Sequence, residues 1–180
     1  MRLFTALDVP ADVAGNLEDL LRRLRPTARI HWSPPANLHV TLKFIGEFPE
    51  ARLAELKTAL AAIAGHGPVA VHLRNVGFFP NARAPRTFWC GLDAPKLASL
   101  AADIDQATAA LDIPQESRPF SPHLTLARIK DRVDLNGLGR AISGLPSIDF
   151  GEFEASSFFL YESQLRPSGS VYTKLAEFPL

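Results

Sequence analysis

The chain has 180 residues, enough to bury a hydrophobic core in one domain or in two small lobes. Its 19 basic and 19 acidic residues balance, which excludes a strong overall attraction to nucleic acid, so a nucleic-acid ligand would have to be held locally. The single cysteine, Cys90, excludes an internal disulfide and a cysteine-rich zinc site.

The N-terminal segment lacks the long apolar core of a signal peptide, and no apolar run is long enough to cross a bilayer. We therefore expect a cytoplasmic protein.

The hydrophobic pattern predicts strands and helices that alternate along most of the chain. Strands are expected at 3–9, 30–32, 38–46, 69–79, 87–92, from 123, and at 171–178, with helices at 11–24, 49–64, 95–111 and 135–142. A bulge is expected at Gly77, and residues 148–161 are expected to be extended. This order, with strands clustered at the end, indicates an α+β fold with mainly antiparallel sheets.

The tetrapeptide His-apolar-Thr-Leu occurs twice, at residues 39–42 and 123–126, each time after a proline-containing loop. Side chains alternate between the two faces of a strand, so the histidine and threonine of each copy share one face. The repeat predicts two related lobes whose sheets face each other across a groove. It is short, and a strand histidine can simply be a packed residue, but two matched copies favour function over packing.

Two imidazoles in one groove can supply a general base and a general acid near neutral pH, which makes His39 and His123 the candidate catalytic residues. The hydroxyls of Thr41 and Thr125 can donate hydrogen bonds to a phosphate held between them. Arg128 could bind the same phosphate through its guanidinium. Regular alternation places Arg128 on the face opposite His123, so either a bulge or the end of the strand must redirect it if it joins the site. Phe44 holds the matching position in the first copy.

Metal binding and covalent catalysis find little support in the sequence. His31, His66 and His72 lack the spacing of metal ligands, and we expect them in loops or on the surface. Cys90 lies in an apolar strand and is expected to be packed rather than reactive. The aromatic residues Trp32, Trp89 and Phe120 are interpreted as core or groove wall.

At these motifs the chain resembles the 2H phosphoesterase superfamily, within it the RNA 2′,3′-cyclic phosphodiesterases, also called 2′-5′ RNA ligases. The resemblance spans nearly the whole chain and rests on residues 2–10, 38–46, 118–128, 161–165 and 169–173. It implies one bilobal domain over residues 1–180, with two mainly antiparallel sheets facing a central groove, helices outside and a pseudo-two-fold axis.

The resemblance also implies a reaction: hydrolysis of RNA 2′,3′-cyclic phosphate ends to 2′-phosphomonoesters, without a metal or cofactor. It assigns His39 as proton donor and His123 as proton acceptor, with Thr41, Thr125 and Arg128 binding the phosphate. The expected partners are RNA ends or short oligonucleotides bearing the cyclic phosphate. We expect a monomer with no membrane association and no obligate protein partner.

Three other functions stay open on the sequence alone. The same site could join RNA ends through a 2′-5′ linkage, which reverses the proposed bond cleavage. It could instead hydrolyse a small cyclic nucleotide, or bind RNA ends without turnover. The balanced charge leaves both short RNA ends and mononucleotides as ligands.

Overall fold

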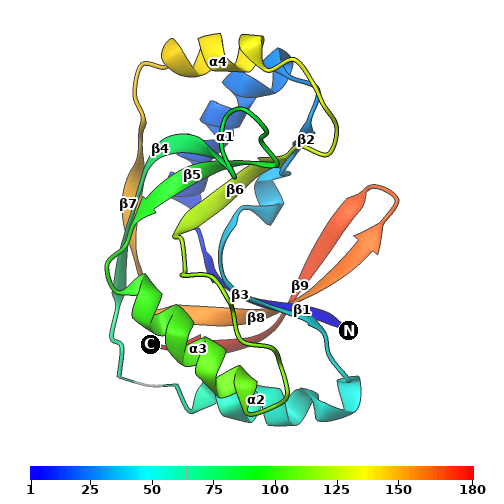
Figure 1. Ribbon diagram of the computed structural model, residues 1–180. Helices are drawn as coiled ribbons and strands as arrows, with labels where there is room; N and C mark the ends of the chain where they lie inside the picture. Colours follow the sequence, from blue (N-terminus) through cyan, green and yellow to red (C-terminus); the bar gives the residue numbers. More distant parts are fainter. Residues whose placement is uncertain (64) are drawn as a thin grey trace.

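Two antiparallel sheets make up the computed structural model, which describes residues 1–63 and 65–180 (Figure 1). The first sheet has the order β3-β1-β8-β9, formed by His39–Glu47, Arg2–Asp8, Ser157–Arg166 and Gly169–Pro179. The second has the order β2-β6-β5-β4-β7, formed by His31–Trp32, His123–Arg128, Thr87–Asp93, Val69–Phe79 and Asp149–Ala155. The predicted α+β class with antiparallel sheets is confirmed.

The helices lie on the outer sides of the two sheets (Figure 1). They are α1 (Ala11–Leu24), α2 (Leu53–Ala61), α3 (Leu97–Ala109) and α4 (Asn136–Ser143). Helix α1 follows β1 of the first sheet but contacts β7 of the second, and α3 follows β5 of the second sheet but contacts β3 of the first. This reciprocal exchange gives the molecule its pseudo-two-fold arrangement and ties the two lobes together.

The pattern of burial explains why these segments become helices. The apolar stripe of α1 is buried in full, through Val13, Leu17, Leu20, Leu21 and Leu24. One contiguous core contains residues from both lobes. Among the described residues, no helix combines the length and apolar character that crossing a bilayer requires.

Two predicted helices are shorter than expected because their first residues form tighter turns. The segment expected at 49–64 opens with a 3-10 turn at Glu50–Arg52, and the helix proper ends at Ala61; its last predicted residue, Ala64, lies outside the described residues. The helix expected at 95–111 begins at Leu97, whose backbone N–H closes a turn onto the Ala94 carbonyl at 3.0 Å.

Residues 148–161 are extended as expected, but they belong to two strands: β7 pairs with β4 in the second sheet, whereas β8 pairs with β1 and β9 in the first. The prediction of a bulge at Gly77 was wrong. The irregularity of β4 lies at Arg74 and Asn75, where Asn75 has a φ of 65°, and not at Gly77. Gly77 instead makes room for the Trp89 ring, since a Cβ there would lie 2.3 Å from it.

A buried ion pair joins the first sheet to the segment that precedes β6. The side chain of Lys43, on β3, is only 1% exposed and pairs with Asp105 of α3. Its Nζ also donates to the carbonyl of Pro114 at 2.9 Å, and the Asp105 carboxylate accepts the backbone N–H of Glu116 at 3.1 Å. Lys43 therefore anchors the start of the segment that leads to His123.

Replacing Lys43 with methionine should lower the free energy of unfolding by about 3 kcal/mol, because the Asp105 carboxylate loses its buried cation. Urea denaturation measures this. The double variant Lys43→Met/Asp105→Leu should recover part of the loss, and Lys57→Met on α2 serves as the control. A loss below about 1 kcal/mol for Lys43→Met would show that the pair contributes little.

Candidate functional site

A β-bulge in β6 redirects Arg128 to the face that carries His123. Trp89 pairs with Thr125 and Phe88 with Ala127, so Leu126 is an extra residue in β6. Burial agrees, since Leu126 and the following Ala127 are both buried while Arg128 is exposed. The extra residue inverts the alternation, so that His123, Thr125 and Arg128 share one face.

The first motif contains the same bulge at the same place. Ala6 pairs with Thr41 and Thr5 with Lys43, so Leu42 is the extra residue of β3. Lys43 consequently points into the core, and Phe44 joins the face of His39 and Thr41 with 52% of its surface exposed. The two halves of the site therefore match in backbone but differ in chemistry: an arginine in one, a phenylalanine in the other.

Ser33 holds the bulge of β6 in place, a role that sequence reasoning missed. Its backbone N–H donates to the Leu126 carbonyl at 2.8 Å, and its hydroxyl donates to the Thr125 carbonyl at 3.1 Å. A bulge leaves carbonyls without their regular partner on the neighbouring strand. Ser33 supplies two of the missing donors from the turn after β2.

Both imidazoles are held in place by the same kind of hydrogen bond, from Nδ1 to the backbone carbonyl two residues earlier. Nδ1 of His39 lies 2.6 Å from the carbonyl oxygen of Asn37, and Nδ1 of His123 lies 2.8 Å from that of Ser121. A carbonyl oxygen only accepts, so each Nδ1 carries the hydrogen. Each Nε2 is then an acceptor in the neutral ring and a donor in the protonated ring, as proton transfer requires.

Three of the predicted site residues come together where the lobes meet. Strands β3 and β6 contact each other, although they belong to different sheets. The positive charge of Arg128 lowers the pKa of both His39 and His123, which requires its guanidinium to lie near both rings. The matched registers put Thr41 and Thr125 on the same faces as their histidines.

The electrostatic surroundings of the two histidines differ. Burial lowers the pKa of each below its ordinary value of 6.5, and this is the largest influence on both. The nearby carboxylate of Asp8 opposes that effect at His39, where it favours the protonated ring. Asp8 itself accepts hydrogen bonds from the Tyr161 hydroxyl and from Lys174.

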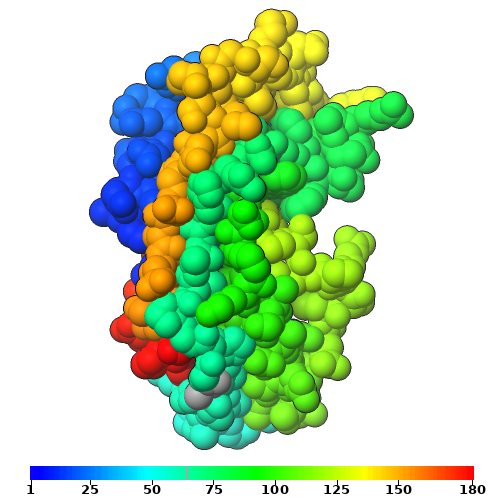
Figure 2. Space-filling model, turned by 90° about the vertical axis from the view of Figure 1, so that its left-hand side faces the viewer, coloured from blue at the N-terminus to red at the C-terminus, as the bar shows by residue number. Residues whose placement is uncertain are grey.

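Aromatic side chains border both imidazoles. The Phe4 ring lies 4.9 Å from the His39 ring, and Tyr172 meets His39 edge-on at 5.3 Å. Phe79 meets His123 edge-on at 5.0 Å and stands at the base of the arm formed by residues 80–86. Figure 2 shows a hollow between this arm and the segment 114–121, whose Ser121 carbonyl binds His123. His123 therefore touches both walls of the hollow.

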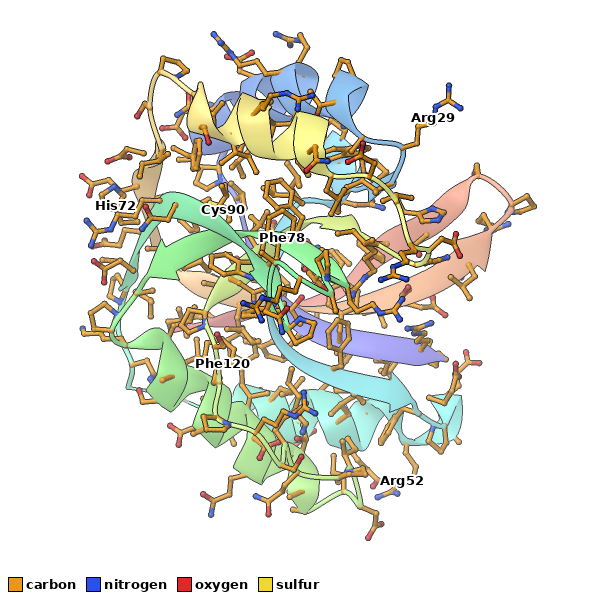
Figure 3. All side chains as sticks on the ribbon, turned by 45° about the horizontal axis from the view of Figure 1, so that its top comes forward. Arg29, Arg52, His72, Phe78, Cys90 and Phe120 are labelled. Atoms are coloured by element: carbon orange, nitrogen blue, oxygen red, sulfur yellow. The ribbon has the colours of Figure 1, made fainter. Side chains whose placement is uncertain are left out.

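His66, His72 and the cysteine are engaged elsewhere, whereas His31 on β2 lies opposite Arg128 in the pairing with β6. His66 pairs with Asp103 and His72 with Asp149, each at 2.8 Å, and His72, on β4, lies on the left of the view in Figure 3. Cys90 is fully buried, and burial raises the pKa of its thiol to about 12. A thiol with that pKa stays protonated at neutral pH, so the prediction of a packed, unreactive cysteine is confirmed.

Comparison with known proteins identifies the family. The LigT-like phosphoesterase family matches residues 7–89 and 92–172. The chain belongs to this family. An RNA 2′,3′-cyclic phosphodiesterase of Methanocaldococcus jannaschii is 33% identical to this LigT-like phosphoesterase over 177 residues, covering 98% of this chain and 99% of the relative.

Two further matches come from Thermus thermophilus. An RNA 2′,3′-cyclic phosphodiesterase of that organism is 35% identical over 190 residues, covering 100% of this chain and 90% of the relative. The crystal structure of its protein TT0787 superimposes with a TM-score of 0.84 at 34% identity, covering 100% of this chain and 98% of that one. The resemblance to 2H phosphoesterases and the predicted bilobal fold are thereby confirmed.

Both imidazoles should titrate below pH 6.5, because burial and Arg128 disfavour their charged forms. NMR titration of the ring protons measures this. Since each folded-state pKa lies below its unfolded value, the unfolded state binds more protons as pH falls through 6.5, and the free energy of unfolding must decrease there. A pKa above 6.5 for both rings would contradict the described environment.

Proposed function

We propose that this LigT-like phosphoesterase hydrolyses the 2′,3′-cyclic phosphate at the end of RNA to a 2′-phosphomonoester, without a metal ion. The observation that carries the proposal is the matched pair of imidazoles, each with Nδ1 bound to a backbone carbonyl and with Arg128 near both. Relatives named RNA 2′,3′-cyclic phosphodiesterase, aligned over nearly the whole chain, support the same substrate.

In the proposed mechanism, Nε2 of neutral His123 accepts a proton from a water molecule as that water attacks the phosphorus. The bond between phosphorus and O3′ breaks, and Nε2–H of protonated His39 donates its proton to O3′. The product carries a 2′-phosphate and a free 3′-hydroxyl, and proton exchange with solvent resets both rings. Each proton transfer contributes about 10²- to 10⁴-fold to the rate.

The charges around the rings support this division of roles. The Asp8 carboxylate favours the protonated form of His39, as a general acid requires. No carboxylate contributes in this way to the pKa of His123 among the described residues. Burial lowers the pKa of both rings, so the Asp8 carboxylate is the charge that favours His39 over His123 as the proton donor. Arg128 and the hydroxyls of Thr41 and Thr125 would stabilise the charge that develops on the phosphate oxygens.

Phe44 is proposed to hold the nucleobase of the reacting nucleotide. It occupies the position equivalent to Arg128 in the other lobe, half exposed on the face of His39, with its ring 6.2 Å from that of Phe4. Aromatic rings bind bases by stacking, which is tolerant of base identity. Arg128 would thus hold the phosphate from one lobe while Phe44 holds the base from the other.

The direct test incubates EDTA-treated protein with a short RNA bearing a 2′,3′-cyclic phosphate and separates 2′- from 3′-phosphate products. The proposal predicts a 2′-phosphate, with the rate reduced at least 100-fold in His39→Ala and in His123→Ala. His72→Ala is the matched control and should keep full activity. A 3′-phosphate product, a requirement for added metal, or near-full activity of either site variant would refute the proposal.

Replacing Phe44 with alanine should raise KM about tenfold or more and change kcat less, since base stacking contributes about 1–3 kcal/mol. Steady-state kinetics on the same RNA measures both constants, and Phe44→Trp should restore KM. An unchanged KM in Phe44→Ala would show that the base does not bind on this face. Leu165→Ala, at the far end of β8, provides a control for loss of an exposed apolar side chain.

A further inference from the structure

Unpaired positive charge gathers beside the candidate site, on two segments that the balanced composition does not reveal. Segments 82–86 and 128–136 contain five cations and two carboxylates, whereas the chain as a whole is neutral. The cations are Arg83, Arg86, Arg128, Lys130 and Arg132. Among the described residues, none of them lies within ion-pairing distance of a carboxylate, although basic residues elsewhere, such as Arg22 and Arg74, are paired.

The two segments are bound to each other directly after Arg128. The backbone N–H of Ile129 donates to the Arg86 carbonyl at 2.9 Å, and the Arg86 guanidinium donates to the Lys130 carbonyl at 2.8 Å. The two cationic segments, 82–86 and 128–136, are therefore joined to each other at the residues that directly follow Arg128 of the candidate site.

A cavity opens between these segments. Its volume is about 690 Å³, within the range of about 300–1,000 Å³ that small-molecule sites occupy. Arg83, Arg86 and Arg132 line it together with Phe78, which is labelled near the middle of Figure 3. Of the two carboxylates in the lining, that of Asp134 accepts the backbone N–H of Asn136 at 2.9 Å.

RNA chemistry links this cavity to the reaction. A 2′,3′-cyclic phosphate lies at the 3′ end of a strand, so every other nucleotide lies on its 5′ side and must leave the hollow in one direction. A single strand is held by cations along its phosphates and by aromatic surfaces against its bases. The lining of the cavity offers both, through its three arginines and Phe78.

We propose that this cavity binds the nucleotides on the 5′ side of the reacting end, with Arg83, Arg86 and Arg132 on their phosphates. The inference rests on the proposed function and extends it, because it makes an oligonucleotide, rather than a cyclic mononucleotide, the preferred substrate. The protein then grips RNA locally, as a chain without net charge must do.

The test compares a ten-nucleotide RNA bearing the cyclic phosphate with 2′,3′-cyclic AMP, in the wild type and in Arg83→Gln/Arg132→Gln. The measured quantity is the ratio of the two kcat/KM values, oligonucleotide over mononucleotide. It should exceed ten in the wild type and fall at least tenfold in the variant. Arg23→Gln/Lys96→Gln, which removes two exposed charges from α1 and from the start of α3, should leave it unchanged.

Binding separates this inference from the proposed function. Fluorescence anisotropy with a ten-nucleotide RNA ending in a 2′-phosphate needs no turnover, and the double variant should bind at least tenfold more weakly. Its logarithmic salt dependence should be shallower by about 0.7 for each lost phosphate contact. If the wild type hydrolyses neither substrate, the proposed function fails, and this weaker binding alone still supports the cavity as an RNA site.

Three results would overturn the inference. The wild type could process the mononucleotide as efficiently as the oligonucleotide, or the double variant could retain both its rate ratio and its affinity for RNA. A third result is that ATP binding is lost in the variant while RNA length has no effect, which would make the cavity a site for a separate nucleotide.

Discussion

The extra residue in each histidine-bearing strand, Leu42 in β3 and Leu126 in β6, determines which side chains face the candidate site. Without it, strict alternation would turn Arg128 away from His123 and Phe44 away from His39. The bulge also turns Lys43 inward, where it anchors the segment before β6. The β-bulge, which occurs in both β3 and β6, thus determines which side chains face the site and contributes to joining the lobes.

The duplicated backbone carries unequal chemistry, and the proposed reaction depends on that inequality. Each imidazole has the same tautomer because each Nδ1 donates to the carbonyl two residues earlier. Asp8 then acts on one ring and not on the other, while Arg128 acts on both. A symmetric pair of histidines would have no preferred donor, whereas this arrangement distinguishes a proton donor from a proton acceptor.

The sequence predicted the parts of the site that follow from local pattern. Alternation placed His39 with Thr41 and His123 with Thr125, and the repeat predicted two facing lobes. It could not decide between a bulge and the end of the strand as the cause that redirects Arg128, because Leu126 looks like an ordinary buried strand residue and its extra status exists only in the pairing with β5. Ser33 escaped notice for the same reason, since its partners lie more than 90 residues away.

Other misses have a similar cause. Lys43 resembles a solvent-exposed strand lysine until α3 brings Asp105 against it, and the break between β7 and β8 depends on the sheets that receive them. The cationic cavity combines two short segments whose charges are unremarkable until Ile129 and Arg86 join them. The catalytic and binding roles of the five predicted site residues stay predictions.

A crystal structure with bound 2′-AMP tests the central claim most directly, because it shows at once what the bulged face holds. The account predicts phosphate oxygens within hydrogen-bond distance of both Nε2 atoms and of the Arg128 guanidinium, with the adenine against Phe44. A regular β6 with Arg128 on the face opposite His123, or a phosphate bound away from either ring, would contradict it.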